Sequence, residues 1–209
     1  MDIKQYLLNF LILGPPFLFA LTLHELAHGY AALRLGDPTA KNEGRLTLNP
    51  LSHLDPFGTI AFFLISIGWA KPVPVNPAYF RNPSKGMLAV ALAGPGANLL
   101  LALASALAVK LLLLLPPASP WLISLLVPAV NMAAASVWIN IMLMVFNCLP
   151  IPPLDGSKVL MGLLPPDAAL RYARMEPYGF LLVLLLSYTG VLGGIIGPAT
   201  RFANGLLLG

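Results

Sequence analysis

Charged residues and cysteines are both scarce in this chain of 209 residues. Lys, Arg, Asp and Glu together make up 10% of it, against about 25% in soluble proteins, so there is too little charge to cover a surface that faces water. The single cysteine, Cys148, excludes an intramolecular disulfide. The net charge of +4 is spread over loops without a basic cluster, which argues against nucleic-acid binding.

Apolar residues are present in excess and make up 58% of the chain. A helix needs roughly 20 residues to cross the hydrocarbon core of a membrane, and four apolar segments reach that length. They cover residues 6–35, 86–115, 121–149 and 178–197. A fifth segment, 57–70, is shorter, which favours a re-entrant or short buried helix. We therefore expect an all-α polytopic membrane protein, a single domain over residues 1–209 with about four to six transmembrane helices.

Two segments between the first two spans predict a small interfacial β element. Residues 45–49 alternate polar and apolar side chains, the pattern of a short strand with one covered face. Residues 71–77 must be extended, because their alternating prolines forbid a helix. An exposed strand edge of this kind can accept another extended chain.

Basic residues are placed unevenly along the chain. If segment 57–70 returns to the side on which it entered, loops 34–85 and 150–176 share one side of the membrane. These two loops contain nine of the 12 Lys and Arg residues. The positive-inside rule then predicts that both loops are cytoplasmic and that the N-terminus lies outside.

The most informative motif lies inside the first span and reads His24-Glu25-Leu-Ala-His28. Residues four apart lie on one helix face, so the two histidines can share a metal ion. Glu25 lies beside that face, where it can take a proton from a water on the metal. Two packing histidines beside a stray acid are the alternative, which the cost of about 2.5–3.5 kcal/mol for an ionisable group at membrane depth disfavours.

A catalytic zinc site needs a third protein ligand. Asp155 is the best candidate, because it follows a proline-rich segment, 147–155, that must unwind the end of the third span. Irregular backbone at membrane depth is tolerated only inside protein or along a watery cavity. The alternative is that Asp155 caps a following helix over residues 156–164. The predicted topology favours the ligand, since it places Asp155 and the histidines at the same membrane face.

Together these motifs resemble those of the site-2 protease family of intramembrane zinc metalloproteases. The resemblance rests on the histidine motif and on Asn147-x-x-Pro150-x-x-x-Leu154-Asp155-Gly156, and it covers about residues 21–157. It implies one zinc ion held by His24, His28 and Asp155, with Glu25 activating water. It also implies that Asn147 lies near the site and helps to polarise the scissile carbonyl. The PDZ and CBS domains of larger members are absent from this sequence.

The expected function is therefore an endopeptidase that cuts within or next to transmembrane segments, in regulated intramembrane proteolysis. By analogy with the family, its substrates are membrane-anchored proteins such as anti-sigma factors or other membrane-tethered regulators. We expect a multi-pass protein of a prokaryotic cell membrane with its active site towards the cytoplasm. A metal-ion transporter is the alternative, since intramembrane His, Glu and Asp also line ion paths.

Four further residues have less specific interpretations. His53 either reaches the metal or, as we expect, bonds to backbone in an interfacial loop. Asn98 and Asn140 lie inside spans, where hydrogen bonding between helices is the default interpretation. Gly94 is interpreted as a small residue that permits close helix packing.

Overall fold

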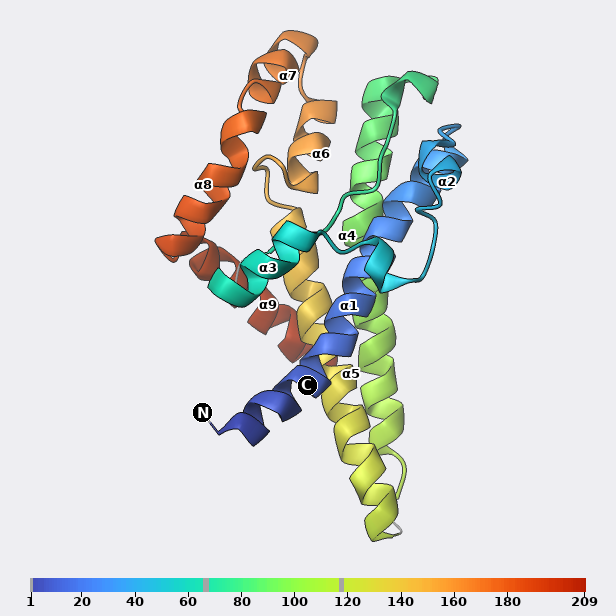
Figure 1. Ribbon diagram of the computed structural model, residues 1–209, viewed down its shortest axis with the longest axis vertical. Coiled ribbons are helices and arrows are strands. Elements are labelled where there is room, and N and C mark those ends of the chain that lie inside the picture. The colour runs from blue at the N-terminus through green and yellow to red at the C-terminus, as the bar shows by residue number, and fades with distance from the viewer. Residues whose placement is uncertain (1, 66–67, 117–118) are drawn as a thin grey trace.

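The protein was analysed as a computed structural model that describes residues 2–65, 68–116 and 119–209 (Figure 1). Its helices are α1 (Ile3–Arg34), α2 (Thr39–Asn42), α3 (Pro56–Ile65), α4 (Pro83–Leu113), α5 (Pro120–Asn147), α6 (Asp155–Leu163), α7 (Pro166–Ala173), α8 (Glu176–Tyr188) and α9 (Val191–Leu208). Two short 3₁₀ helices, η1 (Pro50–Ser52) and η2 (Pro77–Tyr79), lie in the connections.

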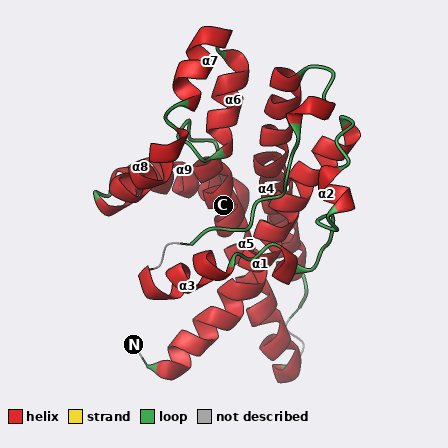
Figure 2. Cartoon of the chain, turned by 45° about the horizontal axis from the view of Figure 1, so that its top comes forward, coloured by secondary structure: helices red, strands yellow, loops and turns green. Residues whose placement is uncertain are grey.

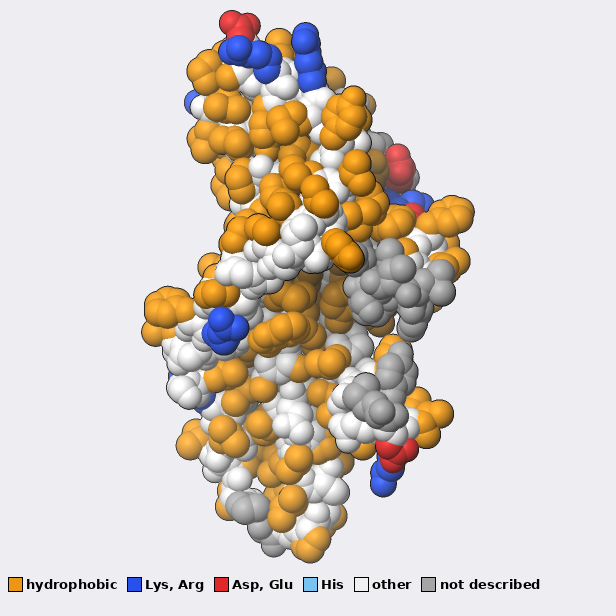
Figure 3. Space-filling view, turned by 90° about the vertical axis from the view of Figure 1, so that its left-hand side faces the viewer, with side chains coloured by type: hydrophobic (Ala, Val, Ile, Leu, Met, Phe, Trp, Pro, Cys, Tyr) orange, Lys and Arg blue, Asp and Glu red, His pale blue; other side chains and the backbone are white. Residues whose placement is uncertain are grey.

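Within the described residues, four helices are long and apolar enough to cross a membrane: α1, α4, α5 and α9. Most of their side chains face outwards, and Figure 3 shows one such face, hydrophobic along its length with few charged side chains. Exposed apolar surface of this extent needs lipid around it. The protein is therefore an all-α polytopic membrane protein, as predicted, and α1, α4 and α5 correspond to the first three predicted spans.

The predicted span over residues 178–197 is wrong, because the chain breaks in its middle. Helix α8 ends at Tyr188, and Gly190 adopts a left-handed conformation with φ of 77°. Only glycine takes up that conformation without steric cost, so the helix turns there. Helix α9 then begins at Val191, and it is α9, not the predicted segment, that is long enough to span.

The short segment 57–70 forms α3 and does not cross. The ten residues of α3 rise about 15 Å, half of the roughly 30 Å of a hydrocarbon core. Residues 66–67 of the predicted segment lie outside the described residues. The two ends of the segment meet: Leu54 and Ala70 form an antiparallel bridge, and the Lys71 N–H donates to the His53 carbonyl at 2.9 Å. The segment therefore returns to where it began, which is the re-entrant form of the prediction.

The strand predicted over residues 45–49 does not form. In the part of the chain that the structure describes, β pairing is limited to the bridge between Leu54 and Ala70. One carbonyl of this segment is instead bonded by a side chain: the buried His53 bonds through Nε2 to the Thr47 carbonyl at 2.9 Å. This contact also confirms the expected interpretation of His53 as a loop histidine bonded to backbone.

Helices α1, α4 and α5 lie side by side and form the centre of the molecule (Figures 1 and 2). Small side chains permit the close approach of α4 and α5, where Ala102 and Ala106 pack on Val137 and Ile141. The proline-rich loop 148–154 leads from α5 into α6, which lies against α4. This path brings the start of α6 close to the C-terminal half of α1.

Candidate metal centre

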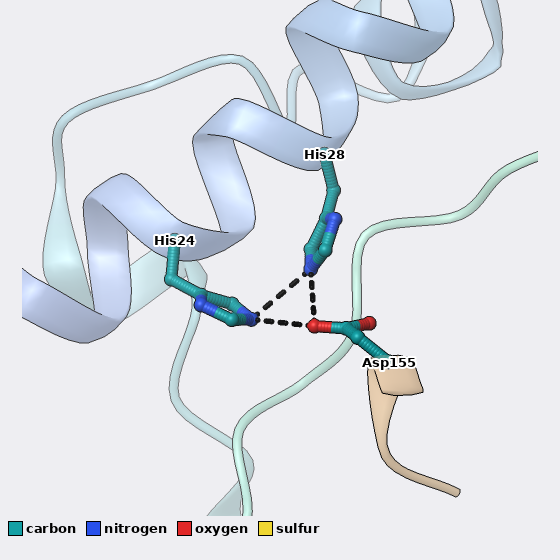
Figure 4. A group of neighbouring side chains, drawn as sticks. All are labelled: His24, His28 and Asp155. Atoms are coloured by element: carbon teal, nitrogen blue, oxygen red, sulfur yellow. Dashed lines mark hydrogen bonds and ion pairs between the residues drawn. The ribbon is translucent and has the colours of Figure 1, made fainter. Parts of the chain in front are cut away.

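His24 and His28 are one turn apart on α1, and both are buried. Their rings meet edge to face, and the two Nε2 atoms lie 3.0 Å apart. Figure 4 shows both Nε2 atoms pointing towards the start of α6. The helical spacing alone therefore brings together two of the three predicted ligands.

Asp155, the first residue of α6, supplies the third ligand. Its Oδ2 atom lies 3.1 Å from Nε2 of His24 and 3.1 Å from Nε2 of His28 (Figure 4). The helix-cap alternative fails geometrically, because the N-cap residue of α6 is Leu154 and no side chain caps this helix.

The far side of each imidazole determines which nitrogen carries the proton. Nδ1 of His28 lies 2.7 Å from the Val90 carbonyl oxygen, which can only accept, so Nδ1 donates, and in the neutral imidazole Nε2 keeps a free lone pair. Nδ1 of His24 lies 2.6 Å from Oδ1 of Asn98, with the same consequence. Metal-binding histidines are typically oriented by such a contact.

Three acceptor atoms therefore converge on one point inside the protein. No donor in the described part of the chain satisfies the buried Oδ2 of Asp155. Three acceptors held about 3 Å apart repel one another unless a cation lies among them. Two imidazole nitrogens and a carboxylate oxygen are a typical zinc donor set, so the residues fit a divalent metal of this kind.

Gly94 on α4 forms one wall of this centre. A Cβ atom at this position would lie 2.5 Å from Nε2 of His28 and 2.6 Å from Cε1 of His24. At Gly96, two residues along, a Cβ would meet nothing within 4 Å. The absence of a side chain at Gly94 therefore makes room for the ligand rings, a more specific role than the helix packing that we predicted.

Glu25 is buried but is not one of the converging ligands. Its Oε2 accepts the Val73 N–H at 2.9 Å, from the segment that includes residues 71–76. Two other side chains hold the same segment. Arg45 donates to the Lys71 carbonyl at 2.8 Å, and Asp37 accepts the Asn76 N–H at 2.7 Å. We call Glu25, Asp37 and Arg45 the clamp.

The clamp residue Asp37 has a pKa below its usual range. Burial acts to raise this pKa, but hydrogen bonds from Thr39 and from the Asn76 backbone outweigh it. The carboxylate therefore remains charged at neutral pH and keeps its donors. Segment 71–76 is neither helical nor part of a sheet, in agreement with the predicted effect of its prolines.

Asn147, the remaining predicted site residue, is placed differently. It is half-buried, and its amide donates to the Leu143 carbonyl of its own helix at 3.0 Å. The described residues show no hydrogen bond between Asn147 and the three converging ligands. Its predicted contact with a substrate carbonyl therefore stays a prediction.

Asn98 and Gly94 are the two site residues that the sequence reasoning missed. They are four residues apart on α4, and this spacing places them on one helix face. That signal was present in the sequence. What the sequence did not reveal is that this face lies against the histidines of α1.

Comparison with known proteins finds bacterial relatives. The chain is 41% identical over 179 residues to the protein named "Putative zinc metalloprotease YwhC" of Bacillus subtilis, covering 85% of this chain and 80% of the relative. It is 32% identical over 201 residues to "Putative zinc metalloprotease Rip2" of Mycolicibacterium smegmatis, covering 90% of this chain and 71% of the relative. No family model and no solved structure matches the chain significantly.

Proposed function

Because this chain belongs to the family of YwhC and Rip2, we propose that it is an intramembrane zinc endopeptidase of the compact site-2 protease type. One observation carries the proposal: Nε2 of His24, Nε2 of His28 and Oδ2 of Asp155 converge within 3.0–3.1 Å of one another. These residues hold one zinc ion per chain. Bound there, zinc supplies a Lewis acid that polarises a carbonyl and lowers the pKa of water.

Glu25 serves as the general base in this proposal. It takes a proton from the attacking water as oxygen bonds to the peptide carbon, and it returns a proton to the leaving nitrogen as the C–N bond breaks. Its position next to His24 suits this role, because Glu25 belongs to the site but does not occupy the ligand set. Asn147 donates to the scissile carbonyl oxygen once substrate displaces its bond to Leu143.

Segment 71–76 binds the unwound substrate backbone. In an extended chain, alternate residues direct their backbone groups to the same edge, so Val73 and Val75 share one edge. The bond between Val73 N–H and Glu25 indicates that this edge faces the site. In the described structure, the N–H and carbonyl of Val75 and the carbonyl of Val73 have no hydrogen-bond partner. They are free to pair with a substrate strand.

A matched pair of variants tests this strand pairing. Val75→Pro removes the free N–H, whereas Val75→Ala retains it. We expect Val75→Pro to cut a single-span substrate up to about tenfold more slowly than Val75→Ala, as for one lost backbone hydrogen bond. Equal cleavage by both folded variants would contradict the strand pairing.

The substrates are membrane-anchored proteins such as anti-sigma factors or other membrane-tethered regulators, and the active site faces the cytoplasm. Both rest on the analogy with the family and on the basic loops. The membrane location itself follows from the four apolar helices, and the relatives are bacterial. A transporter would need several ligand sets along a path. The described residues contain one such group, and it is the set already assigned.

The decisive experiment is the zinc content of the detergent-purified protein. We expect about one zinc per chain in the wild type and in Glu25→Gln, and clear loss in His24→Ala and Asp155→Ala. Glu25→Gln should bind zinc but fail to cleave, because it lacks the base. Full zinc retention in folded Asp155→Ala would refute the ligand set, and cleavage by Glu25→Gln would refute the role of Glu25.

A further inference from the structure

A chain of buried, uncharged polar side chains extends outwards from His24 across three helices. Oδ1 of Asn98 on α4 lies 2.6 Å from Nδ1 of His24. Nδ2 of Asn98 donates to Oδ1 of Asn140 on α5 at 2.8 Å. Nδ2 of Asn140 donates to the Ser136 carbonyl of its own helix at 2.9 Å. Asn98 is 0% exposed and Asn140 is 1% exposed, so water cannot replace these contacts.

The orientation of the two amide side chains follows from the contact between Asn140 and Ser136. A carbonyl oxygen only accepts, so the group of Asn140 that faces Ser136 must be its NH₂. Its Oδ1 therefore faces Asn98, which must present its own NH₂ there. Nδ2 of Asn98 also lies 3.4 Å from the Ala20 carbonyl, a second group that can only accept.

The orientation of these amides determines which nitrogen of His24 carries the proton. With its NH₂ committed to Asn140 and Ala20, Asn98 has only its carbonyl oxygen left for His24. The proton of the neutral imidazole must then reside on Nδ1, and the lone pair on Nε2 faces Asp155 and His28. Reversing either amide would place two oxygens against each other in a buried site, which is costly.

We propose that Asn98 and Asn140 are positioning residues that set the tautomer and the ring orientation of His24 for metal binding. Neither residue touches the metal or the substrate. The inference rests on the proposed zinc site, but the tautomer itself is a property of the metal-free protein. His28 provides an internal reference, because its Nδ1 bonds to the Val90 backbone and not to this chain of amides.

The test uses three substitutions of asparagine by leucine, which remove the amide at similar volume. Asn98→Leu removes the partner of His24, and Asn140→Leu removes only the outer constraint. Asn131→Leu is the matched control, since Asn131 lies on α5 with Asn140 but is exposed. Zinc affinity is measured by competition with a chelator. Imidazole tautomers are measured by ¹⁵N NMR of metal-free, histidine-labelled protein, with signals assigned by single His→Gln variants.

We expect zinc affinity to fall roughly 10- to 100-fold in Asn98→Leu, as for other residues that orient a metal ligand. The loss in Asn140→Leu should be smaller, less than about tenfold, because Asn98 keeps its bond to Ala20. His24 should lose its preference for the Nδ1–H form in Asn98→Leu, while His28 keeps it. A purely structural role would disturb both histidines or neither.

Wild-type zinc affinity and an unchanged His24 tautomer in Asn98→Leu would overturn the proposal. If Asn98→Leu does not fold, Asn140→Leu decides alone, and unchanged affinity and tautomer there would also overturn it. Failure of the zinc-site proposal can be told apart from failure of this one. If the zinc site is wrong, the wild type binds no zinc, while the NMR measurement still reports the tautomer of His24.

Discussion

Two buried polar clusters meet at α1, and they are built in opposite ways. In the ligand set of His24, His28 and Asp155, three acceptors converge and no donor lies among them. In the clamp of Glu25, Asp37 and Arg45, each carboxylate accepts a backbone N–H and the guanidinium donates to backbone carbonyls. Consecutive residues, His24 and Glu25, belong to different clusters.

The difference separates a metal-binding site from a cluster that positions segment 71–76 and includes the proposed base Glu25. Each carboxylate of the clamp has a donor, so the clamp holds segment 71–76 without a metal ion, while Nε of Arg45 is buried without a partner in the described structure. A cluster of acceptors alone is incomplete, and its stability depends on a cation that binds to it. The two clusters should therefore respond differently to metal, to crowding and to pH.

The largest expected effect comes from adding zinc. Free zinc at a thousandfold excess over Kd should stabilise the wild type by about 4 kcal/mol, measured as a rise in the thermal unfolding midpoint over chelator-treated protein. Asp155→Asn, which keeps the shape of the side chain but loses its charge, should lose this response. Asp37→Asn in the clamp should keep it. Equal stabilisation of Asp155→Asn and wild type by zinc would show that the zinc response does not depend on the ligand set.

A crowding variant on α4 should weaken the ligand set by a smaller amount. Gly94→Ala places a methyl group 2.5 Å from the His28 ring, and such overpacking costs about 1–3 kcal/mol. We expect zinc affinity, measured by competition with a chelator, to fall by the factor that this energy corresponds to. Gly96→Ala, where the methyl group meets nothing, is the control. Identical affinities in the two variants would mean that the rings move freely.

Removing one hydrogen bond from the clamp should affect stability but not metal. Val73→Pro deletes the N–H that Glu25 accepts, in a segment whose neighbouring prolines already suit the proline geometry. We expect a loss of about 1.5 kcal/mol in the free energy of unfolding relative to Val73→Ala, and unchanged zinc content in both. Loss of zinc from folded Val73→Pro would show that zinc binding depends on the clamp, and the two clusters would then not be independent.

The smallest expected effect is the pH dependence of the clamp. The folded-state pKa of Asp37 is lowered, so its stabilisation is complete above the unfolded pKa of about 3.9 and is lost as pH falls through the folded pKa below that value. The unfolding midpoint of Asp37→Ala should lie about 2 °C below wild type at pH 6, and this gap should close in acid. A gap that stays constant down to pH 3 would show that the charge of Asp37 contributes nothing.

Much of this architecture follows from local patterns in the sequence. The length of the apolar segments predicted α1, α4 and α5, and the four-residue spacing predicted that His24 and His28 share a face. The re-entrant α3 followed from its shortness. These predictions succeeded because each depends on residues close together in the chain.

The failures depend on contacts that are distant in the chain. The segment predicted as a strand over residues 45–49 has its Thr47 carbonyl bonded to His53 and forms no strand. Hydropathy alone did not show that Gly190 would divide the last apolar segment. The sequence predicts only that Asn98 forms a hydrogen bond between helices. Its contact with His24 could not be predicted, because it depends on how α4 is rotated against α1. Rotation about a helix axis is set by packing, which the sequence of a single helix does not specify.

The polar chain from His24 to Ser136 contains only amides, a hydroxyl and a backbone carbonyl, none of which ionises in the physiological range. Many metal-binding histidines are instead held by a carboxylate, which carries a charge. A charge inside the membrane responds to the transmembrane potential by about 2.3 kcal/mol per 100 mV, whereas a neutral chain feels almost nothing. The amides that orient His24 therefore add no charge of their own to a site that already contains the carboxylate of Asp155.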